Sequence, residues 1–181
     1  QNGRAMPADV PLPPIWLLGS SDYSARLAAQ IGAGFSFAAH FSDLDPAIPM
    51  RLYRESFKPS ARMQTPQAIL AMAVVCADSD ASAADLHFVR RAKGEYLPLA
   101  SPDEAAAYPY TAIDRERIAH NRRRLVVGGP KTVHDRLSAA IAATQADELM
   151  ITTMIHGHEA RTRSYTLLAE MFGLQPPNVQ R

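Results

Sequence analysis

Short apolar runs alternate with longer stretches of helical period along most of this chain, and this alternation constrains the fold more than any other feature. The apolar runs have the length of buried strands and fall at 15–18, 35–40, 68–77 and 147–155. The stretches with helical spacing fall at about 22–31, 43–57, 81–93, 130–143 and 159–172. Strands that alternate with helices are typical of parallel β/α units, so we predict an α/β fold with about four parallel strands.

Four β/α units amount to half of an eight-stranded TIM-type barrel. A complete barrel of this type takes about 250 residues, whereas this chain has 181. We therefore predict one half-barrel domain over 1–181, with an open sheet as the competing architecture. Segment 1–13, which begins with Gln1 and is rich in proline, is expected to be an entry linker of a chain entered midway, and 94–124 an irregular insertion.

A four-stranded half-barrel leaves a strand edge exposed on each side, and exposed edges favour pairing with another chain. We therefore expect a homo-oligomer, or a partner that supplies a missing N-terminal half. The formal net charge of +1 gives no reason to expect nucleic acid or a membrane as partner, so the ligand is expected to be a small molecule.

The single cysteine, Cys76, excludes an internal disulfide, and its apolar neighbours predict a buried thiol. The chain contains no run of about 18 apolar residues, and its start has no basic segment followed by an apolar run. These features predict a cytoplasmic location.

The first predicted strand ends in a turn that suits an anion. Gly19, Ser20, Ser21 and Ser24 lie where that strand ends and the next helix begins. Backbone N–H groups and up to three hydroxyls can point at one phosphate there. The alternative, that Ser20, Ser21 or Asp22 only caps the helix, stays open on spacing alone.

His40 lies where the second predicted strand should end. In a parallel barrel the carboxyl ends of the strands build the active site, so His40 is a candidate to contact a ligand. A core histidine with one satisfied ring nitrogen is the other interpretation, and the pattern does not separate the two.

Other polar groups are weaker candidates. His156, His158 and Glu159 are so close in sequence that they would need a distant ligand to hold a metal, and no HExxH pattern is present, so we expect no metal site. The segment 128–130 lacks the lysine and hydroxyl residue of a P-loop and is interpreted as a helix entry. The triplet 122–124 is interpreted as a solvated basic patch, and Trp16 as a core residue.

Several blocks of the sequence together resemble one known family. They are PPIWLLGSS (13–21) with SARLAA (24–29), FSFAAHF (35–41), YR (53–54), FKPS (57–60), VGGP (127–130), DELM (147–150), HGH (156–158) and RSY (163–165). In this order they look like the fifth strand through the closing helix of the bacterial luciferase-like monooxygenases. The resemblance covers most of the chain from Pro13 to about Glu170.

The resemblance implies the C-terminal half of a (β/α)8 barrel that binds reduced FMN, uses O2 and inserts one oxygen atom into an organic substrate. It places the FMN phosphate at the turn after the fifth strand, which points to Ser20, Ser21 and Ser24 within the turn described above. With Gly19 and His40 these form the predicted cofactor-binding set, and no catalytic residue is assigned.

Nothing in the chain resembles the family's first four strands. Much of a flavin pocket would come from those strands, so an isolated half is expected to bind FMN weakly if at all. The alternatives are an F420-dependent hydride-transfer enzyme of the same superfamily and a non-catalytic half-barrel oligomer.

Overall fold

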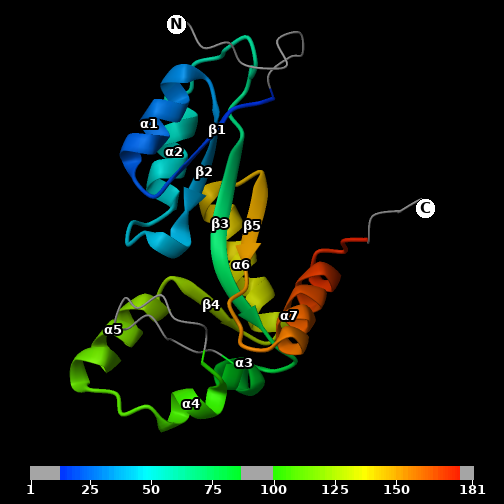
Figure 1. The fold of residues 1–181 in the computed structure, drawn as a ribbon. Coiled ribbons are helices and arrows are strands. Elements are labelled where there is room, and N and C mark those ends of the chain that lie inside the picture. Colours follow the sequence, from blue (N-terminus) through cyan, green and yellow to red (C-terminus); the bar gives the residue numbers. More distant parts are fainter. Residues whose placement is uncertain (1–12, 87–99, 176–181) are drawn as a thin grey trace, which may run out of the picture.

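The protein folds as one parallel sheet with helices, as shown by a computed structural model that describes residues 13–86 and 100–175 (Figure 1). The strands in this part of the chain are β1 (Trp16–Gly19), β2 (Gly34–Ala38), β3 (Ala68–Cys76), β4 (Leu125–Gly128) and β5 (Glu148–Thr152). The sheet runs in the order β1–β2–β3–β4, and β5 also pairs with β3. All pairings are parallel, as the alternating sequence predicts.

The helices follow the strands in the manner of β/α units. They are α1 (Asp22–Ile31), the short 3-10 helix η1 (Ala39–Phe41), α2 (Ala47–Ser56), α3 (Asp80–Leu86), α4 (Pro102–Ala107), α5 (Ala112–Arg122), α6 (Pro130–Thr144) and α7 (His158–Met171). The bounds of α1 are those predicted. The second predicted strand ends two residues earlier than expected, because the chain turns into η1 at Ala39.

The core lies between the sheet and the helices α1, α2, α6 and α7, in two clusters joined by β3. The first contains Phe35, Phe37, Met50, Tyr53 and Leu70, and the second contains Val74, Cys76, Val126, Leu137 and Leu168. Successive side chains of a strand point to opposite faces, so the even-numbered residues of β3 face the helices. Cys76 is fully buried, as predicted.

On the opposite face of the sheet, β1 is exposed. Leu17 packs against the first cluster, so its neighbours Trp16 and Leu18 face the other side, where 37% and 69% of their surface is exposed. The prediction of Trp16 as a core residue is therefore wrong. Its indole lies over Gly34, where a Cβ atom would overlap it, but no described strand continues the sheet beyond β1.

β4 is not among the four strands that the sequence pattern predicts, because the apolar run before Gly128 is weak. It pairs with Ala73 to Cys76, the second half of β3, beyond the point where β2 has ended. Part of the predicted irregular insertion, 94–124, lies outside the described residues, and the described part holds the two helices α4 and α5. Both helices begin with a capping box, in which Ser101 bonds Glu104 and Thr111 bonds Asp114.

The start of β5 is fastened to the start of β3 by polar groups. Asp147 accepts hydrogen bonds from the Ala68 backbone N–H, at 2.7 Å, and from the Arg54 guanidinium, at 2.8 Å. The backbone N–H of Asp147 donates to the Ala68 carbonyl at 2.9 Å. Asp147 thereby connects β3, β5 and α2 at the amino end of the sheet.

Among the described helices, none combines the length and the apolar character needed to span a membrane.

Candidate functional site

The turn between β1 and α1 places a serine-rich segment at the carboxyl end of a strand and the amino end of a helix. Ser21 is the N-cap of α1, with an extended backbone, and its side chain makes no capping hydrogen bond. The first backbone N–H groups of α1 are therefore not occupied by the cap side chain. The positive end of the helix dipole adds to these donors, so the turn suits an anion.

Gly19 and Ser24 are packed against each other across this turn. A Cβ atom at position 19 would overlap both the Oγ and the Cβ of Ser24. Only glycine leaves the Ser24 side chain room to fold back over the end of β1. In this position the Ser24 hydroxyl donates to the Ser21 carbonyl at 2.8 Å, and an incoming anion would have to compete with that carbonyl for the proton.

A residue that the sequence analysis does not single out fixes the same turn. Ser42, at the end of η1, donates through its hydroxyl to the Ser20 carbonyl at 2.8 Å and accepts from the Leu44 backbone N–H at 3.2 Å. Ser42 is 8% exposed, whereas Ser20 is an exposed residue. The turn after β2 is thereby joined to the turn after β1, although 22 residues separate the two serines.

His40 lies in η1, next to this connection. Its Nδ1 is 3.2 Å from the Ala71 carbonyl of β3, and its ring packs against that of Phe41 with 4.1 Å between centroids. His40 is half-buried, and Phe41 is 62% exposed. The structure thus brings Gly19, Ser20, Ser21 and Ser24 together in one turn and places His40 in the turn that Ser42 attaches to it.

An ion-pair cluster connects the loop after η1 to the insertion helices. Asp43 accepts two hydrogen bonds from the Arg124 guanidinium, at 2.6 and 2.9 Å, and lies 3.0 Å from His120 Nε2. The hydrogen bond from Arg124 lowers the pKa of the Asp43 carboxyl below its usual value, and His120 lowers it further. Arg124 therefore belongs to a defined contact rather than to the solvated patch predicted for 122–124.

Other sequence candidates have structural roles. The Gly129 N–H at the start of α6 donates to the Asp80 carboxylate at 2.6 Å, and the Thr132 hydroxyl donates to it at 3.0 Å. This entry to α6 is already occupied by a carboxylate. Within residues 13–86 and 100–175, no three histidine, cysteine or acidic side chains lie close enough to hold a metal.

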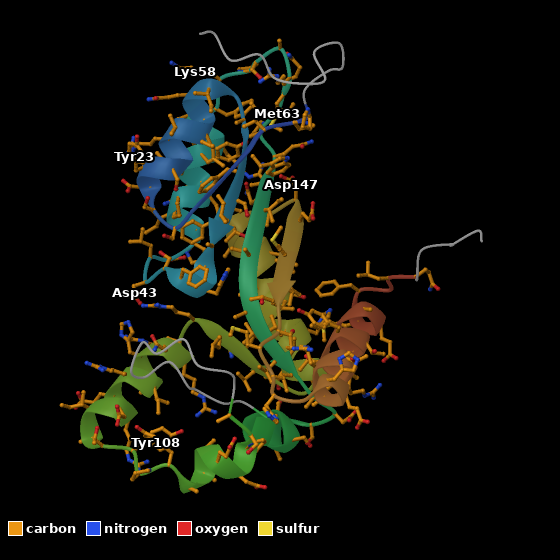
Figure 2. The ribbon with its side chains drawn as sticks, viewed as in Figure 1. Tyr23, Asp43, Lys58, Met63, Tyr108 and Asp147 are labelled. Carbon is orange, nitrogen blue, oxygen red and sulfur yellow. The ribbon has the colours of Figure 1, made fainter. Side chains whose placement is uncertain are left out.

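A cavity of about 440 Å³ lies at the opposite end of the sheet, where residues of 14–15, 31–33 and 60–63 line it. These segments precede β1, β2 and β3, whereas the serine turn follows β1. Figure 2 shows the two ends: Met63 and Lys58 lie at one end of the molecule's upper half, and Asp43 lies at the other. In barrels the amino end of the strands carries stability and the carboxyl end carries chemistry, so the serine turn, not this cavity, is the candidate site.

The comparisons with known proteins agree with this architecture. A family model described as luciferase-like monooxygenase matches residues 1–163. The uncharacterized protein YwcH of Bacillus subtilis (strain 168) is 38% identical over 178 residues, which cover 94% of this chain and 54% of YwcH. A luciferase-like monooxygenase of Escherichia coli (strain K12) is 35% identical over 164 residues, which cover 87% of this chain and 49% of that protein.

Solved structures show a similar fold. The crystal structure of apo-MsnO8 matches with a TM-score of 0.81 and 34% identity, and the match covers 94% of this chain and 56% of the other. Long-chain alkane monooxygenase, LadA, matches with a TM-score of 0.57 at 14% identity, which shows the fold alone.

The chain spans about half the length of the curated relatives it matches. Its fold is a parallel α/β half-barrel like the corresponding part of the luciferase-like TIM-barrel monooxygenases. From the family match over residues 1–163 we conclude that the chain belongs to the luciferase-like monooxygenase family.

Proposed function

We propose that this chain carries the phosphate-binding part of a flavin site in a monooxygenase that uses reduced FMN and O2 to oxygenate an organic substrate. The observation that supports this most is the turn from Gly19 to Ser24, where Ser21 leaves the helix end uncapped. The family of the chain and its structural neighbours are consistent with flavin use, since one neighbour is a riboflavin lyase with a modified FMN.

The residues of the turn fit a phosphate ester. The amino end of α1 supplies backbone donors, and the hydroxyls of Ser20, Ser21 and Ser24 surround it. Because Gly19 has no side chain, the Ser24 side chain can occupy the space beside it. In this arrangement the turn would hold the phosphate, and the attached turn of His40 would lie beside the next part of the cofactor.

FMN supplies the redox chemistry when it is bound, and this chain's residues bind and orient it. A flavin site must also exclude water, and the described strands alone do not enclose such a site. β1 pairs only with β2 and β5 only with β3 among the described strands, so each side of the sheet ends in an unpaired edge. We propose that an N-terminal half, or a second copy of this chain, covers these edges and completes the pocket.

Two alternative functions use the same site or the same fold. In the first, an F420-dependent enzyme would bind its cofactor at the same turn and transfer a hydride. The absorbance of the bound cofactor distinguishes this enzyme from an FMN enzyme. A non-catalytic half-barrel would form stable oligomers and bind neither cofactor.

The paired variant Ser20→Ala with Ser24→Ala tests the phosphate assignment. We expect weaker FMN binding, by roughly tenfold or more, because two hydroxyls that can donate to an anion are lost. Affinity for riboflavin, which has no phosphate, should change little. Equal effects on the two ligands, or no effect on FMN, would refute the assignment of the turn.

A further inference from the structure

His40 occupies the place where the β2–β3 ladder stops. The Phe35 N–H donates to the Gln67 carbonyl at 3.1 Å, and the register pairs Ala38 with Ala71. Bonds of a parallel ladder recur at every second residue, so continuation of β2 would bring the N–H of residue 39 to the Ala71 carbonyl. The chain instead turns into η1, and the His40 ring reaches that carbonyl from the side, at 3.2 Å from Nδ1.

This contact determines which ring nitrogen carries the proton. A carbonyl oxygen can only accept, so Nδ1 must be the donor in the bond to Ala71. In the neutral ring the other nitrogen, Nε2, is then unprotonated and can accept. Among the residues the structure describes, no group forms a hydrogen bond with Nε2.

The turn that holds His40 is attached to the serine turn. Ser42, two residues after His40, bonds the Ser20 carbonyl at 2.8 Å, and Phe41 between them is 62% exposed beside the His40 ring. If the phosphate of a ligand lies in the serine turn, the adjoining part of the ligand can extend toward His40. In a flavin mononucleotide that part is the ribityl chain, which carries hydroxyl donors.

We propose that His40 is a ligand-binding residue, fixed by Ala71 as the Nδ1–H tautomer so that Nε2 accepts a hydrogen bond from a ribityl hydroxyl of the bound flavin. The inference rests on the proposed function, because it takes the ligand from the phosphate assignment. It adds a defined atom, a defined protonation state and a defined part of the ligand.

A histidine with a purely structural role would donate to the Ala71 carbonyl but would not contact a ligand. Two substitutions distinguish this structural role from the ligand-binding role. His40→Asn places an amide N–H near the position of Nδ1, so it keeps the bond to Ala71 and removes Nε2. His40→Gln places its amide near the position of Nε2 and gives up the bond to Ala71.

The tautomer can be measured without any ligand. In the unaltered chain, nitrogen-15 chemical shifts of the His40 ring at neutral pH should show a protonated Nδ1 and an unprotonated Nε2. A ring protonated on Nε2 would overturn the proposal.

The ligand contact is measured by titrating FMN, riboflavin and lumiflavin into the chain and into the two variants. We expect His40→Asn to weaken FMN and riboflavin by the same factor, roughly three- to tenfold, with its melting temperature unchanged. Lumiflavin, which lacks the ribityl chain, should be unaffected. His40→Gln should retain more of the FMN affinity than His40→Asn, at some loss of stability.

The outcomes distinguish this inference from the proposed function. FMN binding that is unchanged in His40→Asn, or an equal effect on lumiflavin, would overturn the assignment of His40 alone. No FMN binding by the unaltered chain would count against a flavin site completed by a second copy of the chain, and would remove the ligand of His40 with it.

Discussion

The Ser42 hydroxyl donates to the Ser20 carbonyl across 2.8 Å and joins the turns that follow two adjacent strands. Ser42 is buried, and its hydroxyl oxygen also accepts a hydrogen bond from the Leu44 N–H. The bond therefore holds the backbone of the serine turn in one place relative to η1. A phosphate site made of backbone donors depends on such positioning, because its donors cannot rearrange independently.

Ser42→Ala tests this role. The bond to the Ser20 carbonyl is lost, and we expect the free energy of unfolding to fall by about 0.5–1.5 kcal/mol. FMN affinity should fall as well, because the serine turn becomes less ordered. Ser56→Ala is the matched control, since the Ser56 hydroxyl also donates to a carbonyl, that of Leu52, but within α2. If both variants bound FMN equally well, Ser42 would have no role in the site.

Gly19→Ala should disrupt the same turn from inside. The new methyl group would overlap Ser24, so the helix start must shift, at a cost of about 1–3 kcal/mol in the free energy of unfolding. Ser24→Gly removes the atoms that overlap, and the double variant should lose less stability than the sum of the single ones. Urea unfolding of the four proteins measures this coupling. Strictly additive losses would show that the two residues do not share the space.

Asp147 should contribute to stability through a backbone group rather than through its charge alone. Asp147→Ala leaves the N–H of the fully buried Ala68 without its acceptor, and we expect a loss of about 1–3 kcal/mol. Asp147→Asn keeps an acceptor oxygen for that N–H and removes only the charge facing Arg54. The Asp147 side chain is 50% exposed, so that charge should be worth less than about 1 kcal/mol. Urea unfolding measures both variants. Equal losses in the free energy of unfolding would mean that the charge of Asp147, rather than its bond to the Ala68 N–H, stabilises the fold.

The contact between Asp43 and Arg124 should weaken in acid. The pKa of the Asp43 carboxyl is lowered in the folded chain, first by the Arg124 hydrogen bond, so the stabilisation is present above the usual value of 3.8. It is lost as the pH falls below that value and through the lowered pKa. A carbon-13 titration of the carboxyl should give a midpoint below 3.8, and Arg124→Ala should move it upward. A midpoint at the usual value in the unaltered chain would mean that the contact does not persist in solution.

The sequence predicts the repeating part of this fold and fails where the structure depends on contacts between distant segments. The bounds of α1 and the strand β3 follow from local apolar spacing with glycine and proline at the ends. β4 is only four residues long and follows a basic triplet, so its pattern is too short to be recognised, and its pairing depends on where β2 ends.

The candidate site shows the same division. Gly19 to Ser24 are adjacent in the sequence and form one predictable turn. Ser42 could not be found in this way, because a serine that bonds a carbonyl 22 residues away has no local signature. The sequence fails to predict the exposure of Trp16, because that exposure depends on what packs against this face of β1 rather than on the residue's own neighbours.

The central claim is that the serine turn holds the phosphate of a flavin, and the most direct test compares FMN with riboflavin. Both are titrated anaerobically into the purified chain, in oxidised and reduced form, while light scattering records its mass. We predict saturable binding in which FMN binds more tightly than riboflavin, because only FMN carries the phosphate. Equal affinities for the two would contradict the account, whereas no binding of either would mean that the flavin site needs the N-terminal half.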